Sequence, residues 1–204
     1  MTAVTDRGPV RPAESPSEPR ARRLFFALWP DEAMRARLAR AVHAAARGCG
    51  ERPVPPEQWH MTLAFLGAVP SARVAALAEV ASAAAHVADV PAAGLDVSLG
   101  RLVAWRAPQV LCVLPLEPPA ALGRLARGLG DALIAAGFAP DVKPFRAHVT
   151  VARKVTRPSE PRDVPVVHWR FERFALIESR TLPGGAVYSV VETYPLCNGA
   201  AARK

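Results

Sequence analysis

The chain has 204 residues, half of them hydrophobic, which suits one domain or two small lobes with a sizeable core. It has no apolar run of about 18 residues and no signal-peptide core, so we expect a cytoplasmic protein without a membrane-spanning helix. The net charge of +8 favours a polyanionic partner, with nucleic acid the first candidate. Three cysteines without a Cys-x-x-Cys pair predict reduced thiols rather than a disulfide framework.

The first segment of the chain differs in composition from the rest. Residues 1–21 are rich in proline, serine and charge and show no periodicity, so we expect a disordered leader. A single domain of two lobes is expected over 22–197, with a frayed tail over 198–204. The body opens with a bulky apolar run, 22–29, which predicts a buried strand.

Helices and strands alternate along the remaining sequence. Apolar residues at helical spacing, with proline or acidic residues at the start and glycine after the end, predict helices over 30–48, 71–88 and 118–136. Apolar and β-branched runs predict strands over 59–67, 95–105, 109–116, 148–155, 169–182 and 186–196. Turn residues join several of these strands as hairpins. About seven strands and three helices in this order indicate an α+β fold with largely antiparallel sheets.

A Pro-rich connector followed by a His-x-Thr strand occurs twice, at His60-Met61-Thr62 and at His148-Val149-Thr150. Each copy follows a predicted helix at some distance. Two related lobes that each contribute one such strand to a shared cleft would explain this duplication. The repeated context, rather than the tripeptide alone, carries the inference.

Side chains on a strand alternate between its two faces, so His60 and Thr62 share one face. Met61, Leu63 and Phe65 then share the other, apolar face, which predicts core. A small residue follows on the polar face and leaves room for a ligand. The polar face of the first strand ends at Ala64, and the second strand repeats the order with His148, Thr150 and Ala152. The pattern predicts two imidazoles and two hydroxyls in one cleft.

Such a cleft is suited to opening a cyclic phosphodiester. A base that takes a proton from water and an acid that protonates the leaving ribose oxygen each contribute roughly 10²–10⁴-fold. Histidine fits both roles because its ordinary pKa, about 6.5, keeps both protonation states accessible near neutrality. Threonine hydroxyls and an arginine would bind the phosphate oxygens. This scheme requires no metal and no cofactor.

The segments WHMTLAFLG and RAHVTVAR resemble the 2H phosphoesterase superfamily. RLFFALWPDE, VPPEQWH, PFRAHVTVAR and YPL resemble its RNA 2',3'-cyclic phosphodiesterase branch, also named 2'-5' RNA ligase. The likeness covers about residues 22–196. It implies a bilobal fold in which two mainly antiparallel sheets, related by pseudo-twofold symmetry, surround a central cleft with the helices outside. It also implies hydrolysis of RNA 2',3'-cyclic phosphate ends to 2'-phosphates.

The resemblance also implies roles for individual residues. His60 matches the general acid that protonates the leaving 3'-oxygen, and His148 matches the base that activates water. Thr62 and Thr150 match the phosphate-binding threonines, and Arg153 matches the arginine of His-x-Thr-x-x-Arg. Strict alternation would put Arg153 on the face away from His148, so it reaches the phosphate only if the strand ends or bulges there.

Several other residues are candidates for RNA contacts. Lys143 and Arg146 flank the second motif, where they would steer RNA or simply be solvated loop charges. Phe145 and Trp105 are candidates for base stacking, with structural roles as the alternative. Three further histidines, His43, His86 and His168, lack a paired motif and are expected to be structural.

Alternative functions remain open at this stage. The same site would also open cyclic phosphates of small nucleotides, or join RNA ends as a 2'-5' ligase by the reverse reaction. A non-catalytic RNA-binding module would be expected to carry damaged motifs, whereas both are intact here. A metallohydrolase lacks a carboxylate at ligand spacing from either motif histidine. We therefore expect a monomeric enzyme that acts on RNA ends without a metal.

Overall fold

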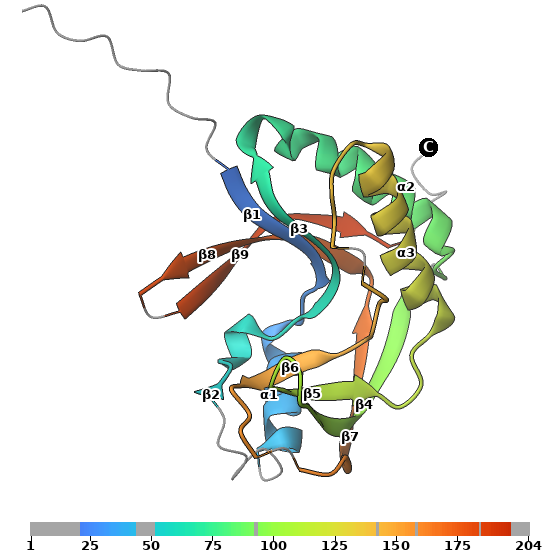
Figure 1. Ribbon diagram of the computed structural model, residues 1–204. Coiled ribbons are helices and arrows are strands. Elements are labelled where there is room, and N and C mark those ends of the chain that lie inside the picture. Colours follow the sequence, from blue (N-terminus) through green and yellow to red (C-terminus); the bar gives the residue numbers. More distant parts are fainter. Residues whose placement is uncertain are drawn as a thin grey trace, which may run out of the picture.

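The computed structural model describes residues 21–43, 52–91, 94–141, 143–157, 159–183 and 185–196. The expected leader, apart from Ala21, and the expected tail lie outside these residues, as do Cys49 and Cys197. The described chain forms two sheets in which every strand pairing is antiparallel, with helices on the outside (Figure 1). The expected α+β class is confirmed.

The first sheet combines strands from the two ends of the described chain. Its order is β3-β1-β8-β9, with β1 at Ala21–Leu28, β3 at Met61–Pro70, β8 at Arg173–Leu182 and β9 at Gly185–Pro195. The sheet curls, and the β8-β9 hairpin projects from it beside the space between the two sheets (Figure 1). β1 is a central strand, which explains its run of five buried residues.

The second sheet is built from the middle of the chain. Its order is β2-β6-β5-β4-β7, with β2 at Arg52–Pro53, β4 at Leu95–Trp105, β5 at Val110–Pro115, β6 at Val149–Arg153 and β7 at Arg162–Phe171. The expected β4-β5 hairpin is confirmed. The proline connector before the first motif contributes β2, whose two residues pair with the end of β6.

One expected strand is wrong. The run 169–182 forms two strands that belong to different sheets, with β7 ending at Phe171 and β8 beginning at Arg173. The alternation of apolar residues breaks at this point, where two polar residues, Glu172 and Arg173, follow each other. β7 also begins earlier, at Arg162, and His168 therefore lies in the second sheet, where its Nδ1 contacts the Ser98 hydroxyl at 3.0 Å.

All three expected helices are present, and they cover the outer faces. α1, Glu32–Val42, is capped by Asp31, whose carboxylate accepts a hydrogen bond from the backbone N–H of Met34 at 2.7 Å. It packs on β7. α2, Leu77–Ala88, and α3, Ala120–Ala135, pack on each other and against the first sheet. Short 3-10 turns span Pro56–Gln58 and Ser71–Ala76. Among the described residues, no helix combines the length and apolarity that crossing a membrane requires.

The two faces of β1 pack into different clusters. Leu24, Phe26 and Leu28 belong to the main core, whereas Phe25 and Ala27 form a small cluster on the opposite face with residues of β8. Trp29, Phe65 and Tyr188 pack against the edge of this small cluster. It forms the apolar floor beside which the first motif histidine lies.

Candidate active site

The two motif histidines are presented by the same local construction. Each lies immediately before its strand, His60 before β3 and His148 before β6. The Nδ1 of His60 contacts the carbonyl oxygen of Gln58 at 2.7 Å, and the Nδ1 of His148 contacts the carbonyl oxygen of Arg146 at 2.6 Å. A carbonyl oxygen only accepts, so Nδ1 carries the proton in both rings. Each neutral imidazole therefore keeps the lone pair of Nε2 available for chemistry.

Both strands are interrupted at the same place in the motif. In β3, Leu63 has no partner on β1. Phe26 of β1 pairs with Ala64, and Ala27 of β1 pairs with Thr62. In β6, Val151 has no partner on β5, because Leu111 pairs with Ala152 and Cys112 pairs with Thr150. A bulge of this kind adds one residue to a strand and reverses the alternation of side chains beyond it.

The bulges correct the expected faces. Ala64 and Ala152, expected beside the ligand, are only 8% and 1% exposed and belong to the core. Phe65, expected in the core, is half-buried and lines the central cavity instead. Arg153 lines the same cavity, and β6 bulges just before it, which is the condition under which Arg153 is expected to reach a phosphate.

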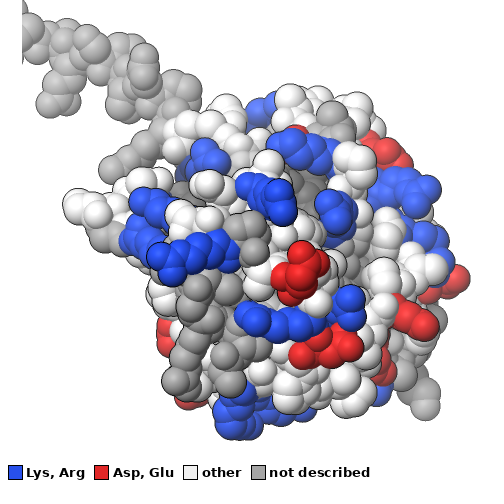
Figure 2. Space-filling view, turned by 60° about the horizontal axis from the view of Figure 1, so that its bottom comes forward, with Lys and Arg blue, Asp and Glu red and all other residues white. Residues whose placement is uncertain are grey.

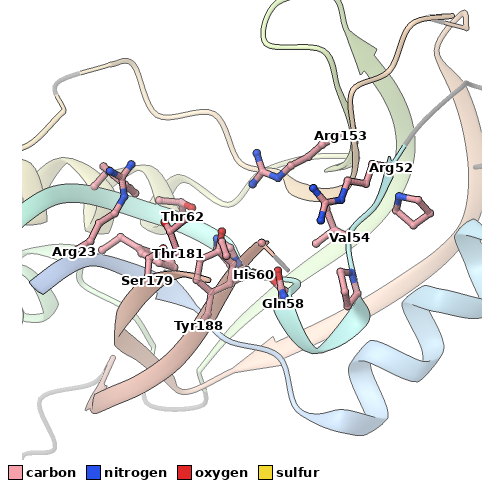
Figure 3. Close-up of a pocket in the computed structure, with 16 residues that line it drawn as sticks. Arg23, Arg52, Val54, Gln58, His60, Thr62, Arg153, Ser179, Thr181 and Tyr188 are labelled. Atoms are coloured by element: carbon pink, nitrogen blue, oxygen red, sulfur yellow. Dashed lines mark hydrogen bonds between the residues drawn. The ribbon is translucent and has the colours of Figure 1, made fainter. Parts of the chain in front are cut away.

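A cavity of about 640 Å³ opens beside the first sheet. His60 and Thr62 lie near its middle, Arg23 at one end, and Arg52 and Arg153 at the other (Figure 3). The remaining described lining residues are Phe25, Pro53, Val54, Pro55, Gln58, Phe65, Ser179, Thr181, Gly185, Ala186 and Tyr188. No described residue that lines the cavity is acidic, so its charge favours an anion.

His148 and Thr150 are not among the residues that line this cavity, although Arg153 of the same strand is. His148 is nevertheless close enough for its charge to lower the pKa of His60. Its ring contacts the ring of Trp105 with centroids 4.7 Å apart, and the guanidinium of Arg146 lies 4.5 Å from the centre of the Trp105 ring. Trp105 therefore links the second motif histidine to a cation.

Three aromatic rings surround His60. The centroid of its imidazole lies 4.9 Å from Phe25, 5.8 Å from Trp29 and 5.1 Å from Tyr188. The Trp29 ring is nearly parallel to the imidazole, and the Tyr188 ring meets it edge-on. This packing restricts the orientation of the ring and shields part of it from water.

The two imidazoles share the direction of their pKa shifts. Burial lowers the pKa of His60 to about 4, the hydrogen bond to Gln58 opposes this, and the charges of Arg153 and His148 lower it further. Burial also lowers the pKa of His148, aided by the charges of Arg146 and Arg153. Both rings are thus neutral near pH 7 in the unliganded site, and a bound phosphate anion would raise both pKa values.

The remaining candidates have other contacts. Lys143 forms an exposed ion pair with Asp141 at 2.7 Å, and Phe145 packs against the main core. Cys112 is fully buried, with Sγ 3.8 Å from the Thr150 hydroxyl, and burial raises the pKa of its thiol to about 12. It is the reduced hydrophobic residue expected.

Sequence reasoning missed Arg23 and Tyr188. The alternation of the first strand contains a signal for Arg23, because Leu24, Phe26 and Leu28 form one apolar face and Arg23 shares the other face with Phe25. Tyr188 has no such signal, since β9 alternates weakly and its partner ring comes from a distant strand. On the face shown in Figure 2, lysine and arginine outweigh acidic residues, which extends the anion preference beyond the cavity.

Comparison with known proteins identifies the family of this chain. The family model described as LigT like Phosphoesterase matches residues 28–111 and 113–188. The RNA 2',3'-cyclic phosphodiesterase of Thermus thermophilus is 32% identical over 191 residues, which cover 85% of this chain and 90% of the relative. The enzyme of the same name from Escherichia coli is 28% identical over 186 residues, 88% of this chain and 98% of the relative.

Solved structures have the same fold. Escherichia coli LigT complexed with 3'-AMP superposes with a TM-score of 0.74 at 23% identity, covering 86% of this chain and 98% of LigT. A crystal structure of a protein from Thermus thermophilus gives a TM-score of 0.68 at 30% identity, covering 85% and 97%. The chain therefore belongs to the LigT-like phosphoesterases, the 2H phosphoesterase family that its two His-x-Thr strands resemble, and it is an enzyme of that family.

Proposed function

We propose that this enzyme hydrolyses RNA 2',3'-cyclic phosphate ends to 2'-phosphates with His60 and His148 as its acid–base pair. The observation that carries the proposal is the matched presentation of the two imidazoles, each with Nδ1 bonded to a carbonyl two residues earlier. The relatives named RNA 2',3'-cyclic phosphodiesterase support the substrate. The basic cavity supports a phosphate ligand.

In this mechanism the neutral His148 takes a proton from water as the oxygen attacks phosphorus. His60 gives a proton to the departing 3'-oxygen, which leaves the phosphate on the 2'-oxygen. The negative charge of the bound phosphate raises the pKa of His60, which favours the protonated ring that the role of acid requires. The role of acid is assigned to His60 by resemblance to the family, because the two motifs are built alike.

Thr62, Thr150 and Arg153 bind the non-bridging oxygens in this scheme. Thr62 and Arg153 line the cavity, and Thr150 precedes the bulge of β6 as Thr62 precedes that of β3. Hydroxyl donors and a guanidinium stabilise the charge that develops on phosphorus in the transition state. Arg153 supplies more of this stabilisation than either threonine, because its hydrogen bonds to phosphate are charge-assisted.

The proposed reaction uses no metal and no cofactor. Within the described ranges, no group of three or more His, Cys, Asp or Glu side chains is arranged to bind a metal ion. Two histidines, two threonines and an arginine supply all the proton transfers and charge stabilisation that the reaction needs. The enzyme is further proposed to act as a cytoplasmic monomer.

The test is hydrolysis of an oligonucleotide with a 2',3'-cyclic phosphate end in excess chelator, with the position of the product phosphate read by phosphorus NMR. We expect turnover to a 2'-phosphate, reduced by about 10²-fold or more in His60→Ala and in His148→Ala. His43→Ala, which removes a histidine outside both motifs, is the control. Absence of turnover by the folded wild type, or full activity in either motif variant, would refute the mechanism.

A further inference from the structure

The Arg23 end of the cavity is separate from the end with Arg52 and Arg153. His60 and Thr62 lie between the two ends, as Figure 3 shows. A cyclic phosphate placed between the motif histidines is within the field of Arg153, which lowers the pKa of both rings. Arg23 is then left for a second anion on the same ligand.

The guanidinium of Arg23 differs from those of the neighbouring Arg22 and Arg180 in its ion pairing. Arg22 and Arg180 both bond to the carboxylate of Glu178, at 3.0 and 3.2 Å, on the other face of the sheet. Within the part of the chain that the structure describes, no carboxylate forms an ion pair with Arg23. On that face the two arginines share a carboxylate, whereas Arg23 presents to the cavity a charge that no described carboxylate pairs with.

Phe65 gives Arg23 a defined position. The guanidinium carbon of Arg23 lies 4.8 Å from the centre of the Phe65 ring, a cation–π contact. Phe65 in turn stacks on Phe25, with ring centroids 6.0 Å apart, so the support is part of the small apolar cluster. Stacking on an aromatic ring leaves the N–H edges of the guanidinium available for a phosphate.

Two hydroxyls accompany this arginine. Ser179 and Thr181 are two residues apart on β8 and line the same cavity. A guanidinium beside two hydroxyl donors, with no acidic residue among the described lining, is suited to the oxygens of a phosphodiester.

We propose that Arg23, Ser179 and Thr181 form a second phosphate subsite that binds the phosphodiester preceding the terminal nucleotide. The inference rests on the proposed function, because the cyclic end must lie at the two histidines. It makes the enzyme selective for cyclic phosphates at the end of a chain over cyclic mononucleotides. A mononucleotide has no second phosphate for Arg23 to bind.

The test compares two product ligands, a nucleoside 2'-monophosphate and a dinucleotide that ends in a 2'-phosphate, by calorimetry. We expect the wild type to bind the dinucleotide at least about 10-fold more tightly, and Arg23→Gln to remove most of this preference without changing the affinity for the mononucleotide. The slope of log K against log salt for the dinucleotide should become shallower by about 0.7 in this variant. Arg23→Lys, which keeps the charge, should retain part of the preference.

Arg127→Gln is the matched control, because it removes one exposed arginine from α3, outside the cavity. It should leave both affinities unchanged. Three outcomes would overturn the subsite: equal or undetectable wild-type binding of the two ligands, a preference that survives in Arg23→Gln, or an equal loss for both ligands. Failure to hydrolyse cyclic phosphates would refute the proposed function instead, since the binding comparison needs no turnover.

Discussion

Phe65 and Arg153 occupy equivalent positions in the two lobes, each five residues after its motif histidine and each just beyond a bulge. Both line the cavity, yet one presents a ring and the other a guanidinium. The two-fold repeat of the backbone is thus combined with different side chains. Phe65 in the lobe of His60 adds an aromatic ring to the cavity, and Arg153 in the lobe of His148 adds a positive charge, which we propose binds the phosphate.

Replacing Arg153 tests this division. Arg153→Gln should lower kcat/KM for a cyclic phosphate end by about 10–100-fold, the loss expected for a bond between a charged donor and phosphate. Arg153→Lys should recover only part of the rate, because a lysine lacks the planar fork. Steady-state kinetics with Arg127→Gln as the control measure both effects. Wild-type activity in Arg153→Gln would remove this residue from the site.

The contact between Trp105 and His148 should matter for rate. Trp105→Leu removes the ring that packs on the imidazole and supports Arg146, so we expect kcat to fall by up to about tenfold, the value of one aromatic pair. Trp105→Phe keeps a ring and should lose less. The nitrogen chemical shifts of His148 should change in Trp105→Leu, whereas those of His60 should not. Unchanged kcat and shifts in Trp105→Leu would show that the contact is incidental.

The lowered pKa of His60 has a consequence for stability. The unfolded chain protonates this histidine near its ordinary pKa of 6.5, whereas the folded protein keeps it neutral down to about pH 4. The unfolded state therefore binds more protons in this window, and the free energy of unfolding falls as the pH falls from 6.5 towards 4. The full shift corresponds to up to about 3 kcal/mol.

Urea unfolding at about pH 7 and about pH 4.5 measures this effect. Wild type should lose about 2 kcal/mol more between the two conditions than His60→Gln, which has no titrating ring at this position. His43→Gln controls for the loss of a histidine as such. Equal losses in wild type and His60→Gln would show that His60 is not held neutral by the fold.

The buried thiol of Cys112 should be unreactive. Thiolate is the nucleophile, and burial raises the pKa of Cys112 to about 12, so iodoacetamide at about pH 8 should leave it unmodified in the folded protein. In denaturant it should react fully. Mass spectrometry of the digest measures the alkylation of Cys49 and Cys197 separately from that of Cys112, so these two thiols serve as internal references. Alkylation of Cys112 at the same rate in both states would contradict its burial.

Sequence patterns predicted most of the elements and the motif pair, because amphipathic spacing and turn residues act locally. They did not predict that the run 169–182 divides between the sheets at Glu172, because the break in alternation at Glu172 and Arg173 does not indicate which sheet the next strand joins. The switch is a tertiary feature. Gly94 allows the close approach there, since a Cβ on it would lie 2.9 Å from the Phe171 carbonyl oxygen.

The faces of the site were predicted only up to the bulges. Alternation placed His60 and Thr62 together correctly, but it reversed Ala64 and Phe65 because the register changes at Leu63. A bulge depends on pairing with a neighbouring strand and cannot be recognised from one strand alone. The same limit explains why the role of Arg153 had to be conditional on a bulge.

The order of strands in the first sheet has a consequence for synthesis. β1 and β3 leave the ribosome early, but β1 also pairs with β8, and β8 with β9, which follow all the other described strands in the sequence. Tyr188, which contacts His60, belongs to β9. The nascent chain therefore has its first motif long before it has the sheet that surrounds it. We expect the enzyme to acquire its cleft only after β8 and β9 have emerged from the ribosome.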